Sequence, residues 1–197
     1  LLDADHFTVD EVDDGDGDGY SSAYEFVCLF LGVVFLWGIG NIETLPLPQS
    51  LDMVLSCSAL QWISDLKALL LNIAQALNPS GHLCFASYTD NNLKEIKALT
   101  GQGLDYLPLA KVCELLESLG FDILLQTEEQ MTLHFEHPKQ VLQHIKATGV
   151  QATAQGFRWT KSSLQDFYTG YQQFQDPESK QYALTYHPVY VIARKTA

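Results

Sequence analysis

The chain has 197 residues, of which 47% are hydrophobic and 18% are charged, and its formal net charge is −13 at pH 7. This composition excludes a chain that is disordered throughout, and the length allows one domain with a hydrophobic core, with or without a short appendage. Residues 1–25 hold nine acids and no Lys or Arg, giving −9, whereas residues 26–197 hold 15 acids and 11 bases, giving −4. Such a chain lacks the basic face that general nucleic-acid binding requires, so we expect no nucleic-acid partner.

The acidic segment Asp13–Phe26, DDGDGDGYSSAYEF, fits two patterns that imply different functions. As D-x-G-x-G-x-G, it is a glycine loop of the kind that approaches a nucleotide cofactor. As D-x-D-x-D-G-x5-E, between Asp14 and Glu25, it is an EF-hand calcium-binding loop. In the second interpretation, the ligands of Ca²⁺ are Asp14, Asp16, Asp18, the Tyr20 carbonyl and Glu25.

Spacing favours the calcium loop over the glycine loop. If Asp13–Gly19 were the glycine loop, two crossover connections and two strands would have to fit between Asp13 and Asn41, which are only 28 residues apart. Two crossovers of about 10–12 residues and two strands of about five residues need more than ~30. No acid lies between Phe26 and Gly40, although the nucleotide pattern needs one about 20 residues on to hold the ribose hydroxyls. The segment before Asp14 is a poor amphipathic helix and no second calcium loop follows, so an acidic disordered head remains an alternative.

The segment Phe26–Gly40, FVCLFLGVVFLWGIG, is apolar but only 15 residues long, whereas a membrane-spanning helix needs about 20. It also lacks the basic residues that precede the apolar core of a signal peptide. We therefore expect a buried helix, or a helix followed by a strand, and no membrane partner. The four cysteines are widely spaced and form no metal or redox motif, which suits a protein of the reducing cytoplasm.

From Asn41 onward, apolar strand patterns alternate with amphipathic helix patterns. The predicted strands are residues 51–57, 82–88, 121–126, 128–136 and 182–195, and the predicted helices are residues 64–81, 91–101, 109–120, 137–149 and 160–174. This alternation predicts an α/β fold with a doubly wound sheet. In such sheets, ligands bind beyond the carboxyl ends of the strands.

Four segments of this region resemble the class I S-adenosylmethionine (SAM)-dependent methyltransferases, and more narrowly the malonyl-[acyl-carrier-protein] O-methyltransferases of biotin synthesis. They are GNIETLPLPQSLDMVLSCSALQWISDL (40–66), LNPSGHLCFASY (77–88), HIKATGV (144–150) and LTYHPVYVIARK (184–195). The resemblance implies a Rossmann-like sheet with helices on both faces and a helical insert, residues 137–175, before the last strand. The resemblance covers residues 40–195, and we expect residues 40–197 to form one methyltransferase-like domain. Residues 1–39 are then an atypical acidic head, and the normal first βαβ unit is missing.

The resemblance also assigns residues to the SAM site. Asn41 takes the place of an acid that accepts the adenine amino group, a departure that removes a charge-assisted hydrogen bond. Ile42 is expected beside the adenine, and Gln61 and Trp62 beside the substrate pocket. The methionine part and the transferred methyl are expected to be bordered by Ser56, Cys57, Ser58, Ala59 and Leu60.

The activity that the resemblance implies is methyl transfer from SAM to the free carboxylate of a malonyl thioester on acyl carrier protein. This carboxylate is already ionised at neutral pH, so the reaction needs no general base and we expect no catalytic side chain. The alternative is a non-catalytic methyltransferase remnant that acts as an interaction protein with a calcium-binding head.

A local excess of positive charge stands out in the predicted insert. Between His137 and Lys161 there is no Asp or Glu, and the bases are Lys139, Lys146, Arg158 and Lys161. Such a patch fits the docking of an acidic acyl carrier protein, because opposite charge speeds the encounter. The alternative is a solvated helix surface with no partner.

Overall fold

The computed structural model describes residues 27–31, 34–38, 42–101, 103–104, 106–148 and 160–196. Three groups of predicted residues therefore lie outside the described part of the chain: the calcium loop Asp14–Glu25, Asn41 and Arg158. Among the described residues, no helix combines the length and the apolar character that crossing a bilayer requires.

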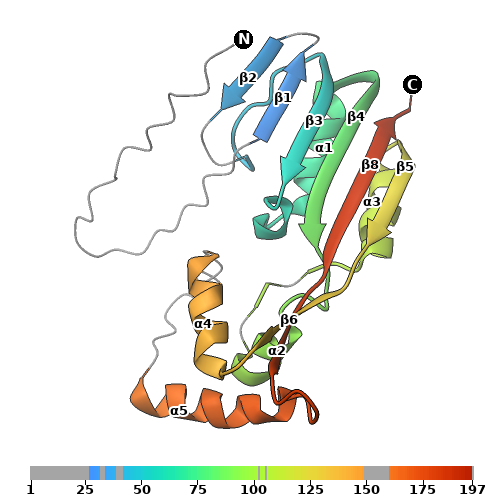
Figure 1. Ribbon diagram of the computed structural model, residues 1–197. Coiled ribbons are helices and arrows are strands. Elements are labelled where there is room, and N and C mark those ends of the chain that lie inside the picture. The colour runs from blue at the N-terminus through green and yellow to red at the C-terminus, as the bar shows by residue number, and fades with distance from the viewer. Residues whose placement is uncertain are drawn as a thin grey trace, which may run out of the picture.

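The described chain is built on a sheet of six strands in the order β2-β1-β3-β4-β8-β5 (Figure 1). Their bounds are Val27–Leu31 for β1, Val34–Gly38 for β2, Leu51–Cys57 for β3, Leu77–Tyr88 for β4, Phe121–Glu128 for β5 and Pro188–Lys195 for β8. Strands β3 and β4 are parallel, whereas β8 runs antiparallel to both β4 and β5. The α/β class is confirmed, and the loss of a first βαβ unit stays a prediction because residues 1–26 are not described.

The helix predicted within Phe26–Gly40 is wrong for the described residues. Strands β1 and β2 pair with each other in antiparallel register, and β1 also pairs with β3. The segment is rich in Val and Phe, which favour extended backbone where a neighbouring strand offers hydrogen bonds. The helical spacing of its apolar residues is therefore overridden by pairing with β3. An EF-hand loop that ends at Glu25 would be followed by a helix, but the described residues after it form strand β1.

Helices α1 (Leu66–Ala76) and α3 (Leu109–Ser118) cover one face of this sheet (Figure 1). The main core lies between them and the sheet, and its most buried side chains include Leu51, Leu69, Leu70, Leu83, Leu116 and Ala193. Helix α1 is shorter than predicted because β4 begins at Leu77. The extra residues of β4, which include Pro79, are accommodated by a register shift against β3.

The start of α1 is capped by Asp65, whose carboxylate accepts a hydrogen bond of 2.9 Å from the Ala68 amide. Replacing Asp65 by alanine is expected to cost about 1 kcal/mol of unfolding free energy, because the Ala68 amide loses its cap. The measurement is urea denaturation followed by circular dichroism. Ser64→Ala is the matched control, since only its backbone amide is engaged there, by Glu43. Equal stability of the two variants would contradict the cap.

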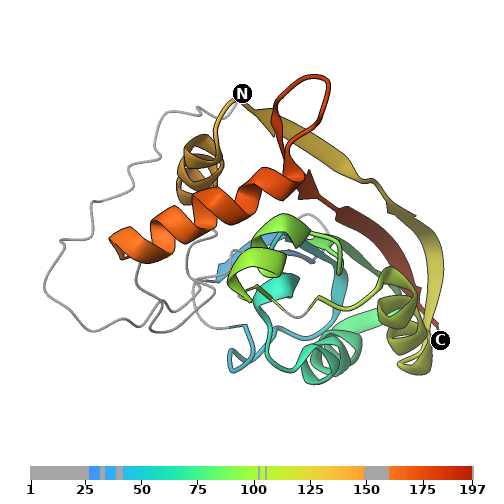
Figure 2. The same ribbon diagram turned by 90° about the horizontal axis from the view of Figure 1, so that it is seen from below.

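A second, smaller layer lies beyond the carboxyl end of β4 (Figures 1 and 2). It contains the antiparallel pair β6 (Met131–Phe135) and β7 (Tyr182–Tyr186). Its helices are α2 (Lys94–Thr100), α4 (Pro138–Ala147) and α5 (Lys161–Gly170), followed by the 3₁₀ turn Tyr171–Phe174. Helices α4 and α5 lie where the sequence predicted two helices, and the domain boundary at residues 39 and 40 stays a prediction.

The small layer has its own hydrophobic core. Its buried members are Leu93, Val141, Ile145, Phe167, Tyr171, Tyr182 and Leu184. Because β5 is followed directly by β6, and β7 directly by β8, both connections to the main sheet are short. The small layer is therefore held next to the carboxyl end of β4, where the fold class predicts a ligand site.

Candidate active site at the carboxyl ends of β3 and β4

Strands β3 and β4 end side by side, because Cys57 pairs with Ala86 in parallel register. Just beyond β3, the Ser58 amide donates a hydrogen bond of 2.9 Å to the Ala86 carbonyl. Ser58 has a positive φ of 55°, and the chain then enters the 3₁₀ turn Leu60–Trp62. This reversal carries the predicted cofactor segment across the end of the sheet.

The structure brings most of the predicted cofactor residues to this place. Ser56 is buried in β3, Cys57 and Ser58 are exposed, and Ala59 and Leu60 are buried. The Ser56 hydroxyl oxygen is buried and has no hydrogen-bond partner among the described residues. Because buried polar atoms are normally paired, this oxygen fits a position beside a polar ligand group.

Ile42 is also buried and belongs to the main core. Its neighbour Glu43 holds this segment to the start of α1, because one carboxylate oxygen accepts hydrogen bonds from the Ser64 and Asp65 amides at 2.9 and 3.1 Å. The segment after Asn41 is thus fastened to the same helix that follows the 3₁₀ turn. This arrangement brings the predicted adenine side and the predicted methyl side of the site onto one part of the fold.

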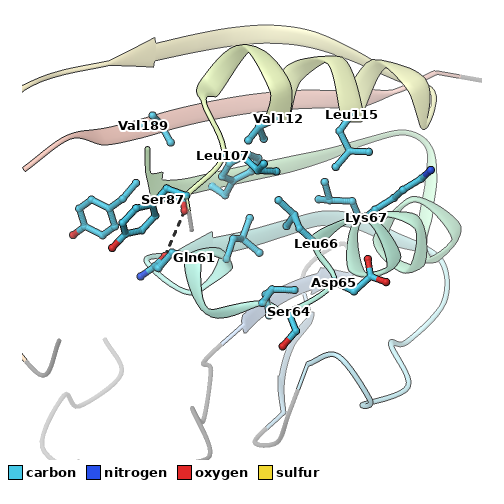
Figure 3. A pocket seen from close by; sticks show the side chains of 16 residues that line it. Gln61, Ser64, Asp65, Leu66, Lys67, Ser87, Leu107, Val112, Leu115 and Val189 are labelled. Atoms are coloured by element: carbon cyan, nitrogen blue, oxygen red, sulfur yellow. Dashed lines mark hydrogen bonds between the residues drawn. The ribbon is translucent and has the colours of Figure 1, made fainter. Parts of the chain in front are cut away.

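A cavity of about 300 Å³ lies between α1, α3 and the end of β4 (Figure 3). Its wall is mainly apolar, with Leu66, Leu107, Val112, Leu115 and Val189 among the lining residues. The volume is at the lower end of the ~300–1,000 Å³ found for small-ligand sites. The predicted substrate residue Gln61 lines this cavity, whereas Trp62 is not among its lining residues.

Gln61 connects the predicted cofactor segment to the cavity. Its side-chain amide donates a hydrogen bond to the Ser58 carbonyl. Its amide oxygen accepts a hydrogen bond of 3.4 Å from the Ser87 hydroxyl, which also lines the cavity (Figure 3). The polar end of the cavity therefore lies beside the segment that is expected to border the transferred methyl.

Two further polar residues of the cavity, Tyr88 and Tyr106, were missed from the sequence. Tyr88 is the last residue of β4, so its position after a parallel strand was a usable signal. Tyr106 lies in the connection between α2 and α3, and it gave no sequence signal. Burial is the main reason that the pKa of Tyr106 is raised, and the neighbouring Tyr88 and Tyr186 raise it further. Its hydroxyl is therefore protonated at neutral pH.

The lysines of the predicted basic patch are exposed. Lys139 and Lys146 lie on α4, and Lys161 is the first residue of α5. Both helices belong to the small layer beyond the carboxyl end of β4 (Figure 1). Within the described ranges, no group of three or more His, Cys, Asp or Glu side chains could hold a metal ion.

Comparison with known proteins shows that this chain is similar to methyltransferases. Residues 32–85 match the family model described as "Methyltransferase domain". The malonyl-[acyl-carrier protein] O-methyltransferase of Acinetobacter baylyi is 43% identical over 163 residues, covering 82% of this chain and 64% of that protein. The enzyme of the same name from Chlorobium luteolum is 40% identical over 165 residues, covering 83% and 61%. The chain thus spans less than two thirds of the length of these relatives.

Solved structures give the same fold. A Bacillus halodurans protein described as a methyltransferase has a TM-score of 0.56 at 14% identity, covering 80% of this chain and 76% of that one. The YcgJ protein of Bacillus subtilis has a TM-score of 0.54 at 12% identity, covering 80% and 70%. The chain therefore has the fold of these solved methyltransferase structures, and in sequence it resembles the malonyl-[acyl-carrier protein] O-methyltransferases.

Proposed function

We propose that this chain carries out SAM-dependent methylation of the free carboxylate of a malonyl thioester on acyl carrier protein, a step of biotin synthesis. The observation that carries the proposal is the 43% identity over 163 residues to the Acinetobacter enzyme, whose name states this substrate. The reversal at Ser58 and the adjoining cavity supply a place for the two reactants. The non-catalytic alternative has no such support.

SAM, when bound, supplies a methyl group activated by its attachment to a sulfonium sulfur. The residues proposed to hold it are Asn41 and Ile42 on the adenine side and Ser56–Leu60 on the methionine side. The Ser56 hydroxyl, unpaired among the described residues, is available to a polar group of the cofactor. Gln61 stands between this segment and the cavity, where it would align the substrate.

The chemistry requires alignment rather than proton transfer. A carboxylate has an ordinary pKa near ~4, so it is ionised at neutral pH and needs no base. Its oxygen forms the new bond to the methyl carbon as the carbon–sulfur bond breaks, and the products are a methyl ester and S-adenosylhomocysteine. The apolar wall of the cavity excludes water from the carboxylate, and the residues around it hold the reacting atoms in line.

The proposed macromolecular partner is an acyl carrier protein, a small acidic protein. Lys139, Lys146, Arg158 and Lys161 are proposed to attract it, and Gln61 and Trp62 to lie near the arriving acyl group. We also propose that the protein acts in the cytoplasm, where cysteines remain reduced.

The direct test is to incubate the full chain with SAM and malonyl-acyl carrier protein and to detect the methyl ester by mass spectrometry. Acetyl-acyl carrier protein is the control, because it lacks the free carboxylate and should give no methylated product. SAM binding, measured separately by calorimetry, is expected to be weak but detectable. A folded chain that neither binds SAM nor forms the methyl ester would refute the proposed function.

Calcium binding at Asp14–Glu25 is a separate proposal that rests on the sequence pattern. If the loop binds Ca²⁺ only when folded, millimolar calcium is expected to raise the melting temperature. Glu25→Gln should abolish this rise because the bidentate carboxylate is lost. Magnesium at the same concentration serves as the control. An unchanged melting curve with calcium would refute the loop and would leave the methyltransferase proposal untouched.

A further inference from the structure

Two tyrosine side chains, Tyr88 from the last position of β4 and Tyr106, line the cavity. The rings of Tyr88 and Tyr106 lie 6.4 Å apart at an angle of 62°. The ring of Tyr186, from the end of β7, also lies 6.4 Å from that of Tyr88, and the Tyr186 hydroxyl is 3.0 Å from Nε2 of His144 on α4. Residues from the main sheet, a connecting segment and the small layer therefore meet here.

Among the described residues, the Tyr106 hydroxyl accepts a hydrogen bond but donates none. Asn92 donates a hydrogen bond of 3.1 Å from Nδ2 to the Tyr106 oxygen, which therefore acts as the acceptor. The orientation of this amide is fixed on its other side, because Asn92 Oδ1 accepts a hydrogen bond of 3.1 Å from the His187 amide. Since Asn92 is also buried, its NH₂ group is held toward Tyr106 and the tyrosyl proton points elsewhere.

The Tyr88 hydroxyl has no hydrogen-bond partner among the residues that the structure describes, and Tyr88 is only partly buried. Both tyrosines line the cavity together with Gln61 and Ser87. Two side chains that carry neutral O–H groups thus line the same cavity as Gln61, which is bonded to the segment expected to border the transferred methyl.

These donors suit a particular ligand group. An ionised carboxylate is a pure acceptor with two oxygens, and hydrogen bonds to a charged group are stronger than those between neutral groups. Neutral donors orient such a group without pairing it to a full positive charge, so its negative charge is preserved for attack on a methyl group. The cationic residue Lys67 lies at the opposite end of the cavity from Gln61 and Ser87 (Figure 3).

We propose that the hydroxyls of Tyr88 and Tyr106 bind the free carboxylate of the acyl thioester substrate, and that Asn92 is a positioning residue that orients the Tyr106 proton. The inference rests on the proposed function and adds to it the residues that select a dicarboxylic acyl group. A thioester without the second carboxylate, such as an acetyl thioester, leaves both donors unpaired and is bound less well.

The test compares two probes that differ only in the carboxylate, malonyl-pantetheine and acetyl-pantetheine, with binding to the full chain measured by calorimetry. The chain should prefer malonyl-pantetheine, and Tyr88→Phe/Tyr106→Phe should weaken its binding by about tenfold or more. Binding of acetyl-pantetheine should not be weakened, because this probe has no carboxylate to pair with the two hydroxyls. Tyr190→Phe is the matched control, because Tyr190 is exposed on β8 and does not line the cavity.

Asn92→Asp tests the positioning role. It keeps the acceptor for the His187 amide but removes the donor to Tyr106, whose hydroxyl then donates to the new carboxylate. Preference for the malonyl probe should fall, and adding Tyr106→Phe should cause little further loss. A purely structural role for Asn92 predicts instead a lower melting temperature with the malonyl preference intact, which would overturn the positioning role.

The outcomes separate this inference from the proposed function. If the double phenylalanine variant keeps the malonyl preference, or if the unmodified chain shows none, carboxylate recognition by these tyrosines is overturned even where methyl ester is formed. If the preference depends on the tyrosines but no methyl ester forms, the inference stands and the proposed function fails. If the double variant fails to fold, the single Tyr88→Phe variant replaces it, because Tyr88 is not fully buried. This single variant should show part of the same loss of malonyl binding.

Discussion

Replacing Glu95 by alanine is expected to lower the free energy of unfolding by about 2–4 kcal/mol. Glu95 is buried in α2, and its carboxylate accepts hydrogen bonds from the backbone amide and the hydroxyl of Thr185 at 3.0 and 2.5 Å. Alanine leaves both Thr185 donors buried without an acceptor, and each such donor costs about 1–3 kcal/mol. The loss is expected to separate α2 from β7, so the small layer should be the part that is weakened.

The measurement is urea denaturation of the full chain, with amide hydrogen exchange to locate the weakened region. Glu114→Ala is the matched control, because Glu114 forms an exposed ion pair with Lys111, and such pairs contribute about 0–1 kcal/mol. Glu95→Gln, which keeps one acceptor oxygen, should fall between the two. A Glu95→Ala variant as stable as Glu114→Ala would contradict an anchoring role.

The local environment of Glu95 supports this anchoring. The pKa of Tyr171 is raised mainly by burial and further by the Glu95 carboxylate. The Tyr171 hydroxyl donates a hydrogen bond of 2.8 Å to the Ala183 carbonyl on β7. Two buried side chains, from α2 and from the turn after α5, thus bind neighbouring residues of β7. Because β7 leads directly into β8, these bonds also fix the small layer against the main sheet.

Helices and strands could be predicted from the sequence where their local hydrophobic pattern fits only one type of secondary structure. Strand β3 was expected over residues 51–57 and is found there, and α4 differs from its expected range only at its ends. Both have an uninterrupted apolar pattern between clear start and stop residues. The pair β1 and β2 was missed because its apolar spacing also fits a helix, and only pairing with β3 decides between them.

The candidate site could be predicted in part for a related reason. Gln61 was assigned by the resemblance, and its place after the end of β3 agrees with the expected position of ligands beyond a parallel strand. Tyr106 and Asn92 are 14 residues apart in sequence and are joined by a hydrogen bond that no local pattern indicates. Asn92 is also held by the His187 backbone amide, 95 residues further along the chain, and such a contact is a property of the tertiary fold.

Reversing the charge of Lys139, Lys146 and Lys161 together, each to glutamate, is expected to slow association with the proposed partner, malonyl-acyl carrier protein, by about tenfold or more at low salt. The three side chains are exposed on α4 and α5, and an acidic partner would be attracted to them over a distance. The effect should shrink as salt is raised, because exposed charges are screened within about 10 Å at 0.1 M ionic strength. The measurement is stopped-flow or surface-based binding at low and moderate salt.

A matched pair of single variants separates the local effect from net charge. Lys146→Glu and Lys111→Glu change the net charge equally, but Lys111 lies on α3, away from α4 and α5 in both views (Figures 1 and 2). Only Lys146→Glu should slow association and reduce its salt dependence. The dissociation rate and the binding of malonyl-pantetheine, which carries no protein, should remain unchanged in both variants. Equal association rates for the two would mean that these lysines form a solvated surface and do not dock the proposed carrier protein.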